Sequence, residues 1–221
     1  MNISKKPLFF RIILIFIICA SVILYMAFII YVLKQKGIHI SIESSSRNIP
    51  GLLAQNLLEF VMTFIILVIS IVMLKKEFIN EMYMKVEGKK QWMLVIFLIA
   101  VYMGRIIYYL VTSDNKIMGI YRIFYYLIFV AFVEEFICRG VCAYLVKDEK
   151  TVVRYLVPNL AFSSMHIFNY SGWNSLSVSY IMHFLTASLI GLLVGGIIFQ
   201  LMKEKSGTIW VPILVHAICD Y

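Results

Sequence analysis

Charged residues are scarce in this chain, and their scarcity excludes most soluble folds. Only 14% of the 221 residues are Asp, Glu, Lys or Arg, whereas 62% are hydrophobic, and the mean hydropathy is +0.91. A soluble domain typically carries about 25% charged residues. The formal net charge of +8 comes from Lys and Arg residues that stand between apolar runs and form no single basic stripe, which argues against a nucleic-acid partner. The composition predicts an integral membrane protein.

The chain also lacks the alternating apolar and polar pattern of a membrane β-barrel. Lipid permits only helices or closed barrels to cross a bilayer, and apolar runs of about 18 residues or more indicate spanning helices. Five long runs and two shorter ones are present: Leu8–Leu33, Leu52–Leu74, Trp92–Thr112, Gly119–Val146 and Ser179–Met202, with Tyr155–Phe168 and Thr208–Tyr221 shorter. We expect an all-α, multi-pass transmembrane bundle of about seven helices, or eight if one is broken or re-entrant.

No long linker, low-complexity tract, convincing repeat or cleavage signal divides the sequence. We expect one membrane domain over residues 1–221, with a non-diagnostic part at 1–117 and a motif-bearing core at 118–221. Twelve Lys and Arg residues flank the runs on one side and four on the other, so the positive-inside rule predicts a cytoplasmic N-terminus and an extracytoplasmic C-terminus. The twelve are Lys5, Lys6, Lys75, Lys76, Lys85, Lys89, Lys90, Lys147, Lys150, Arg154, Lys203 and Lys205; the four are Lys34, Lys36, Arg47 and Lys116.

The chain has only four cysteines and four prolines. Because the cysteines all fall within apolar runs, we expect small packing residues and no disulfide or zinc thiolate. Pro158 and Pro212 are expected to disturb their helices one or two turns before a histidine. The small residues Ala187, Gly191 and Gly195 recur at four-residue spacing and predict close approach of a neighbouring helix.

Ionisable groups are rare inside the apolar runs, and each costs about 2.5–3.5 kcal/mol at a helix centre on insertion scales. The carboxylates of Glu134 and Glu135 and the guanidinium of Arg139 therefore indicate a site. At a rise of about 1.5 Å per residue, Glu134, His166 and His216 lie about 20, 18 and 16 Å from the nearest cytoplasmic charge. We expect these three residues to meet near the middle of the bilayer.

Helical phase separates the two adjacent carboxylates. At about 100° per residue, Glu135 and Arg139 lie on nearly one face, whereas Glu134 points elsewhere. We expect Glu135 to pair with Arg139 and Glu134 to be the reagent. The same i to i+4 spacing relates Phe162 to His166 and His216 to Asp220.

Four further ionisable residues are expected to stand outside this site. His183 comes out about 30 Å from the cytoplasmic flank, which places it at the outer interface. His39 lies in the polar first loop and is expected to be solvated. Glu59 and Arg105 lie at similar depths of about 24 and 22 Å, so they are expected to neutralise one another, with substrate contact as the alternative.

A carboxylate and two imidazoles at one depth can hydrolyse a peptide bond in two ways. A glutamate assisted by histidine can deprotonate water, or Glu134, His166 and His216 can hold Zn²⁺ with water in the fourth position. The chain has no H-E-x-x-H signature, and the spacing leaves both mechanisms open. Intramembrane carboxylates and histidines also occur in non-catalytic membrane proteins and in ion-coupled transporters, although the two related halves common in transporters are absent here.

Three motifs in order carry a resemblance to a known family. Residues 134–139 match E-E-x-x-x-R, residues 162–166 match F-x-x-x-H, and residues 216–220 match H-x-x-x-N/D. Over about Ile123 to Tyr221 the chain resembles the CPBP intramembrane proteases, which include CAAX prenyl endopeptidases and bacterial bacteriocin-processing or self-immunity (Abi) proteins. The resemblance implies a helical bundle with a water-filled cavity that cleaves a membrane-associated peptide or protein.

The resemblance also implies a role for each motif residue. Glu134 and His166 would activate the water, His216 and Asp220 would bind the oxyanion, and the supporting residues Glu135, Arg139 and Phe162 would shape the site. Position 220 is Asp where many relatives carry Asn, and an ionised Asp cannot donate a hydrogen bond to an oxyanion. Either Asp220 is protonated, or it orients His216. The last apolar run has only 14 residues, so either its helix ends in the outer half of the bilayer or sequence follows it.

Overall fold

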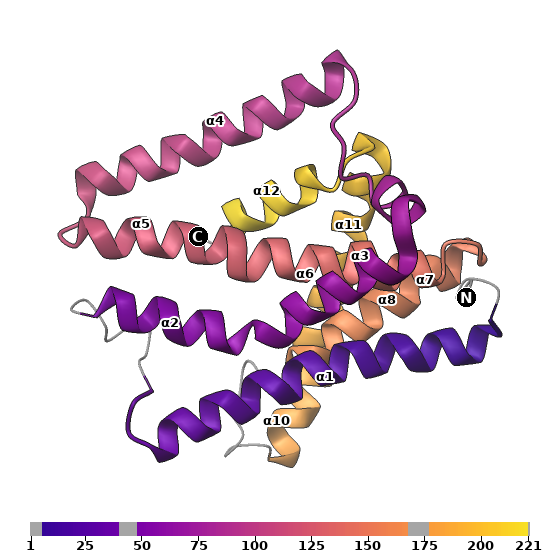
Figure 1. Ribbon diagram of the computed structural model, residues 1–221, viewed down its shortest axis with the longest axis horizontal. Coiled ribbons are helices and arrows are strands. Elements are labelled where there is room, and N and C mark those ends of the chain that lie inside the picture. Colours follow the sequence, from indigo (N-terminus) through magenta and orange to yellow (C-terminus); the bar gives the residue numbers. More distant parts are fainter. Residues whose placement is uncertain (1–5, 40–47, 168–176, 221) are drawn as a thin grey trace.

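The computed structural model describes residues 6–39, 48–167 and 177–220, with the backbone alone at 73–79 and at 81, and these residues are almost entirely helical (Figure 1). Six elements are single helices: α1 (Leu8–Gln35), α2 (Ile49–Glu59), α3 (Val61–Glu81), α4 (Lys89–Thr112), α8 (Thr151–Met165) and α12 (Trp210–Cys219). No strand occurs in the described ranges, which confirms the all-α prediction.

Two longer rods combine α-helical and π-helical stretches. Lys116–Leu145 consists of α5 (Lys116–Phe124), η2 (Tyr125–Phe132), α6 (Val133–Glu135), η3 (Phe136–Cys142) and α7 (Ala143–Leu145). Val178–Ser206 consists of α10 (Val178–His183), η4 (Phe184–Ser188) and α11 (Leu189–Ser206). π-Helical turns are rare and frequently mark functional sites, and here η2 and η3 flank the short α6 that carries the two adjacent glutamates.

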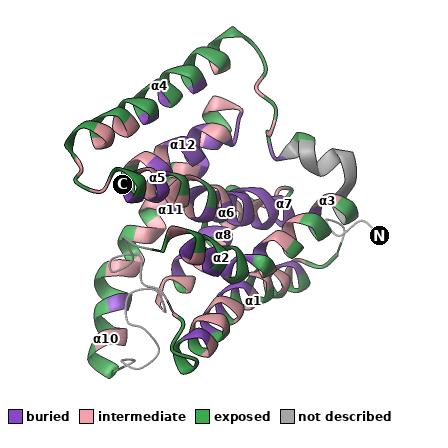
Figure 2. Ribbon diagram, turned by 60° about the vertical axis from the view of Figure 1, so that its left-hand side comes forward, coloured by how far each residue is buried: buried purple, intermediate pink, exposed green. Residues whose placement is uncertain are grey.

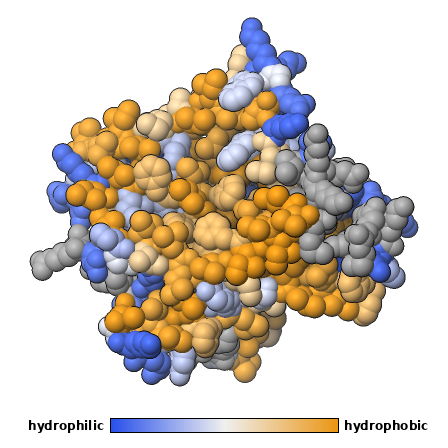
Figure 3. Space-filling model, viewed as in Figure 1, coloured by the Kyte–Doolittle hydropathy of each residue, from blue (hydrophilic) through white to orange (hydrophobic). Residues whose placement is uncertain are grey.

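Four helices are long and apolar enough to cross a membrane: α1, α4 and the two composite rods. The bent pair α2 and α3 adds a fifth candidate, because the two segments meet at 48° on either side of Phe60. The predicted run Leu52–Leu74 is thus the broken helix. The fold is that of a membrane protein, and apolar residues cover most of the face in Figure 3, with hydrophilic residues mainly towards the margins.

The two shorter predicted runs form helices that do not reach across a bilayer. Helix α8 has 15 residues and α12 has 10, which correspond to about 22 and 15 Å of rise against a hydrocarbon core of about 30 Å. Their predicted ends, Phe168 and Tyr221, lie outside the described residues, as do the flanking residues Lys5 and Arg47. Each of these short helices carries one of the predicted site histidines in or directly after its last turn.

Neither proline interrupts its helix. Helix α8 continues through Pro158, and Pro212 is the third residue of α12, in the first turn, where the missing N–H has no intrahelical partner to lose. Both helices are therefore continuous from their proline to the last turn, where His166 and His216 lie.

The Lys116–Leu145 rod is the central helix of the bundle. In its most apolar window 39% of the residues are buried, against 11–17% in the other three long candidates. Helices α12 and α4 pack along its first half, and α8, α3 and α11 pack against η3. Figure 2 shows buried residues gathered on this rod, α8 and α12, while α4 is largely exposed. The exposed apolar side chains of α4 are suited to lipid.

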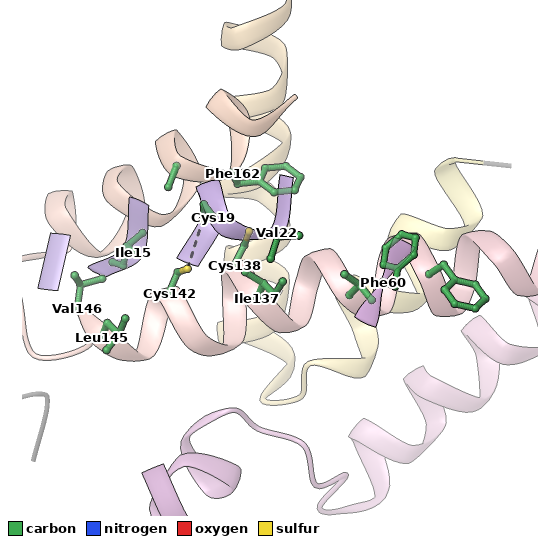
Figure 4. Packing of buried hydrophobic residues seen from close by; sticks show 13 residues of the cluster. Ile15, Cys19, Val22, Phe60, Ile137, Cys138, Cys142, Leu145, Val146 and Phe162 are labelled. Atoms are coloured by element: carbon green, nitrogen blue, oxygen red, sulfur yellow. Dashed lines mark hydrogen bonds between the residues drawn. The ribbon is translucent and has the colours of Figure 1, made fainter. Parts of the chain in front are cut away.

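Helix α1 is fixed to the bundle at its start and at its middle. Arg11 donates to the carbonyl of Leu145 at 2.8 Å and pairs with Glu149. Cys19 lies 4.0 Å, sulfur to sulfur, from Cys142 in an apolar core (Figure 4). Cys138 belongs to the same core, and all four cysteines are free, with Cys219 exposed. Three of the four cysteines are therefore buried packing residues, as expected, whereas the expectation is wrong for Cys219, which is exposed.

The predicted pair of Glu59 and Arg105 is wrong. Glu59 is buried at the end of α2, where its carboxylate accepts a hydrogen bond from Gln55 at 3.0 Å, and no ion pair among the described residues joins it to Arg105. The reason is topological: α4 packs on α5 and α12, on the other side of the central rod from α2 (Figures 1 and 2).

The predicted small-residue stripe does not face a neighbouring helix. A Cβ atom added at Gly191 or Gly195 would meet nothing within 4 Å, whereas one added at Gly196 would meet Asn159 and Arg139. The close approach of neighbouring segments occurs one residue later, at Gly196 on another face of α11.

The two other histidines stand apart from the site motifs. His183 is exposed at the end of α10. His39 is half-buried, and burial together with the nearby Lys34 charge lowers its pKa, so it is less solvated than its loop position predicts.

Candidate active site

The three residues placed at one depth by sequence do meet in the structure. The Glu134 carboxylate, on α6, has its Oε2 atom 3.8 Å from Nε2 of His166 and 3.7 Å from Nε2 of His216. His166 is the residue at the C-terminal end of α8, and His216 lies in α12. The side chain of Glu134 is 19% exposed and that of His166 is 13% exposed, so both residues are mostly buried but not fully enclosed. Three segments far apart in sequence thus present one carboxylate between two imidazoles.

Glu135 points away from this meeting point and into the protein. Its side chain is fully buried, and Oε1 lies 3.1 Å from Nη1 of Arg139, one turn later. The predicted ion pair is therefore present. Glu135 has a second partner that helical phase did not predict: the same oxygen lies 2.9 Å from Nδ1 of His216.

His216 faces a carboxylate at each ring nitrogen. Nδ1 lies against Glu135, and Nε2 lies 3.2 Å from Oδ2 of Asp220, one turn later in the chain. Ionised carboxylates only accept hydrogen bonds, so an imidazole that donates to both must be an imidazolium. The geometry favours the cationic form of His216 and places Asp220 where it can orient the ring.

His166 is held differently. Its Nδ1 atom lies 3.0 Å from the carbonyl oxygen of Phe162, which can only accept, so Nδ1 carries the proton. In the neutral ring Nε2 then carries no proton and can accept a hydrogen bond, and it faces Glu134. The Phe162 ring packs edge-on against the imidazole, with centroids 4.5 Å apart. Phe162 supplies both a carbonyl and a ring to fix His166.

Arg139 is enclosed by aromatic rings. Its Cζ atom lies 4.5 Å from the Phe162 centroid and 5.6 Å from the Phe199 centroid, and its side chain is 1% exposed. Within the described residues its guanidinium nitrogens make no hydrogen bond of suitable angle, so the Glu135 charge and the two ring faces hold it. Phe199 also stacks on His216, with centroids 4.8 Å apart and planes at 17°.

Several residues of this environment have no strong sequence signal. Phe199 is one aromatic residue among 16 phenylalanines. Asn159 and Gln200 are buried and joined by a hydrogen bond of 2.9 Å between α8 and α11, and only their polarity within apolar runs could have indicated them. Lys203 was expected on the cytoplasmic flank, but it is 6% exposed and donates to the carbonyl of Arg139 at 2.6 Å.

The residues do not fit a zinc site. No group of three or more His, Cys, Asp or Glu side chains in the described ranges is arranged to hold a metal ion. Tetrahedral ligands about 2.0–2.2 Å from zinc would lie about 3.3 Å apart, whereas Glu134 Oε2 is 3.7 and 3.8 Å from the two histidines. Both nitrogens of His216 already face carboxylates. Zinc binding by Glu134, His166 and His216 therefore stays a prediction, which chelation can test.

Comparison with known proteins identifies one family. Residues 115–221 match the family model described as type II CAAX prenyl endopeptidase, Rce1-like. The matched segment includes all three motifs, from Glu134 to Asp220. No curated protein and no solved structure matches the chain.

Proposed function

We propose that this chain, whose residues 115–221 match the Rce1-like type II CAAX prenyl endopeptidase family model, hydrolyses a peptide bond with water activated by Glu134 and His166. The match supports an intramembrane protease of the CAAX type. The residue roles, the substrate and the orientation in the membrane are our proposal. The observation that carries it is the position of Glu134 Oε2, less than 4 Å from Nε2 of both histidines.

The separation of Glu134 and His166 is suited to a water molecule held by both. At 3.8 Å the two atoms are too far apart for a direct hydrogen bond, and a polar separation beyond about 3.5 Å is commonly bridged by water. Glu134 accepts one water proton, and Nε2 of His166 accepts a hydrogen bond from the other. The water oxygen then attacks the carbonyl carbon of the substrate.

The imidazolium of His216 is suited to the negative charge that develops on the carbonyl oxygen. Both ring N–H groups face carboxylates, so His216 would stabilise the oxyanion through its positive charge, which acts strongly in a site of low dielectric. When the tetrahedral intermediate collapses, the C–N bond breaks and Glu134 returns its proton to the leaving amine. Hydrolysis consumes one water and yields a carboxylic acid and an amine, which become a carboxylate and an ammonium group when the acid's proton passes to the amine. In this scheme Asp220, 3.2 Å from Nε2 of His216, takes the second of its two predicted roles and orients the ring.

For the substrate we propose a membrane-associated peptide or protein, such as a bacteriocin or signalling-peptide precursor, with processing or self-immunity as the outcome. For topology we propose the cytoplasmic N-terminus and extracytoplasmic C-terminus that the charge distribution predicts.

Purified protein in lipid nanodiscs, assayed on quenched prenylated and leader-type peptides, tests the proposal. Glu134→Gln keeps the shape of the side chain but cannot accept a proton, and loss of a general base lowers kcat by about 10²–10⁴-fold. Glu59→Gln is the matched control, because it changes another buried intramembrane carboxyl on a different helix. Full activity in folded Glu134→Gln would refute the mechanism, and no cleavage of any peptide by the wild type would favour a non-catalytic immunity protein.

A further inference from the structure

A buried lysine lies behind the site and takes no direct part in it. Lysine is almost never fully buried without a partner, yet Lys203 of α11 is 6% exposed. Its Nζ atom donates to the carbonyl oxygen of Arg139 at 2.6 Å and lies 5.2 Å from the ring centroid of Tyr83. This lysine therefore fixes the backbone of η3 at the residue that carries the site's guanidinium.

Lys203 belongs to one face of α11 that is turned towards the site. Gly196, Phe199, Gln200 and Lys203 recur at i, i+3, i+4 and i+7, which places them on a single helix face. Each meets a site-bearing segment. Phe199 stacks on the imidazole of His216, and Gln200 bonds to α8.

The glycine on this face provides the space that the other contacts need. A Cβ atom at Gly196 would lie 2.4 Å from Oδ1 of Asn159 and 2.9 Å from Nη2 of Arg139. Both side chains thus rest directly on the α11 backbone. Asn159 also donates to the carbonyl of Tyr155 at 2.7 Å, which ties it to its own helix. The α11 face holds α8 and η3 at fixed positions.

The contacts form a chain from Lys203 to the site. Lys203 holds the Arg139 carbonyl, Arg139 pairs with Glu135 at 3.1 Å, and Glu135 lies 2.9 Å from Nδ1 of His216. The intervening segment η3 is π-helical, a conformation that is rare and occurs mostly as short bulges, so an external donor at its carbonyl stabilises an uncommon backbone. A shift of this turn would move Glu135 away from His216.

We propose that Lys203 is a positioning residue for peptide hydrolysis: by fixing the Arg139 turn of η3, it keeps Glu135 against Nδ1 of His216. The orientation and charge of His216 then depend on a residue that touches neither substrate nor water. The proposal rests on the proposed function for its kinetic consequence, but its structural consequence can be measured without a substrate.

Three variants test the proposal. Lys203→Met removes the donor and the charge at similar length, Lys203→Arg keeps a donor, and Lys205→Met changes an exposed lysine of the same helix. A misplacement of about 1 Å can cost about 100-fold in rate, so we expect Lys203→Met to lower kcat by about 10–100-fold with KM within about twofold. Lys203→Arg should recover part of kcat, and Lys205→Met should match the wild type.

Nitrogen NMR of ¹⁵N-histidine-labelled protein gives a readout that needs no substrate. The groups that face His216 are Glu134, Glu135 and Asp220, with the Phe199 ring on its face. We expect Lys203→Met to shift the ring signals of His216, assigned by their loss in a His216→Gln variant, and Lys205→Met to leave them in place.

The outcomes separate this proposal from the proposed function. If the wild type cleaves and Lys203→Met keeps its kcat and its His216 signals, or raises KM alone, positioning by Lys203 is wrong while the protease mechanism stands. If the wild type cleaves nothing, the NMR comparison still decides the positioning. If Lys203→Met does not fold, Lys203→Gln takes its place with the same expected results, because its amide is uncharged and its side chain is shorter than that of lysine, so it does not reproduce the contact with the Arg139 carbonyl.

Discussion

Replacing Glu135 with glutamine is expected to destabilise the protein far more than the same replacement at its neighbour Glu134. Glu135 is fully buried and serves two cationic partners, Arg139 at 3.1 Å and His216 at 2.9 Å. Glu135→Gln leaves both charges in the core without their anion. Glu134 is 19% exposed, and its histidine contacts exceed hydrogen-bond distance. The two isosteric changes therefore remove very different amounts of electrostatic stabilisation.

The magnitude follows from the burial of each pair. Removing one partner of a buried ion pair costs about 3–5 kcal/mol, whereas a partly exposed pair is worth about 0–1 kcal/mol. For a protein of this size 1 kcal/mol corresponds to about 2–4 °C in Tm. We expect Glu135→Gln to lower Tm by about 6–20 °C and Glu134→Gln by about 4 °C or less, on the same scale.

Thermal unfolding in one detergent, followed by intrinsic tryptophan fluorescence, measures both variants under identical conditions. The double variant Glu135→Gln with Arg139→Met supplies the control, because it removes the anion and a cation together and should recover part of the lost stability. Equal decreases in Tm for the two single variants, or no recovery in the double variant, would refute the assignment of Glu135 as the counter-charge.

Two further predictions concern the α11 face and metal dependence. Gly196→Ala should lower the free energy of unfolding by about 1–3 kcal/mol, because its Cβ would overlap Asn159 and Arg139. Gly195→Ala should not destabilise the protein in the same melting assay. Equal effects of the two substitutions would contradict the packing described here. Prolonged treatment with a zinc chelator should leave kcat within about twofold of the untreated enzyme, because the described ligand geometry does not fit zinc. A loss of activity that added zinc restores would establish the metal mechanism instead.

Sequence patterns predicted much of the site, because its main contacts follow from spacing within one helix or from depth along the helix axes. The pairing of Glu135 with Arg139 needs only the i to i+4 spacing, and it is present at 3.1 Å. A common depth along the helix axes predicted the meeting of Glu134, His166 and His216, and their helices are also neighbours in the bundle. Long continuous apolar runs likewise predicted the helical bundle.

Relations that depend on which helices are neighbours could not be predicted in this way. Glu59 and Arg105 share a depth, but the central rod lies between their helices, so depth alone gave a false pair. Lys203 was expected at the cytoplasmic flank, because charge patterning does not show that a lysine turns inward to a backbone carbonyl. The stacking of Phe199 on His216 could not be predicted, because it depends on the packing of α11 against α12.

The charges of the site balance within the bundle, and this balance links stability to chemistry. Arg139, Lys203 and an imidazolium at His216 contribute three positive charges, and Glu134, Glu135 and Asp220 contribute three negative charges, so the formal sum is zero. A neutral His216 would leave a net charge of −1 in a medium where an isolated charge costs several kcal/mol. Glu134 must be ionised to accept a proton from water. The imidazolium at His216 therefore offsets the burial of the proposed base, and its positive charge would stabilise the oxyanion. That charge depends on the Glu135 carboxylate, which Arg139 and, behind it, Lys203 hold in place.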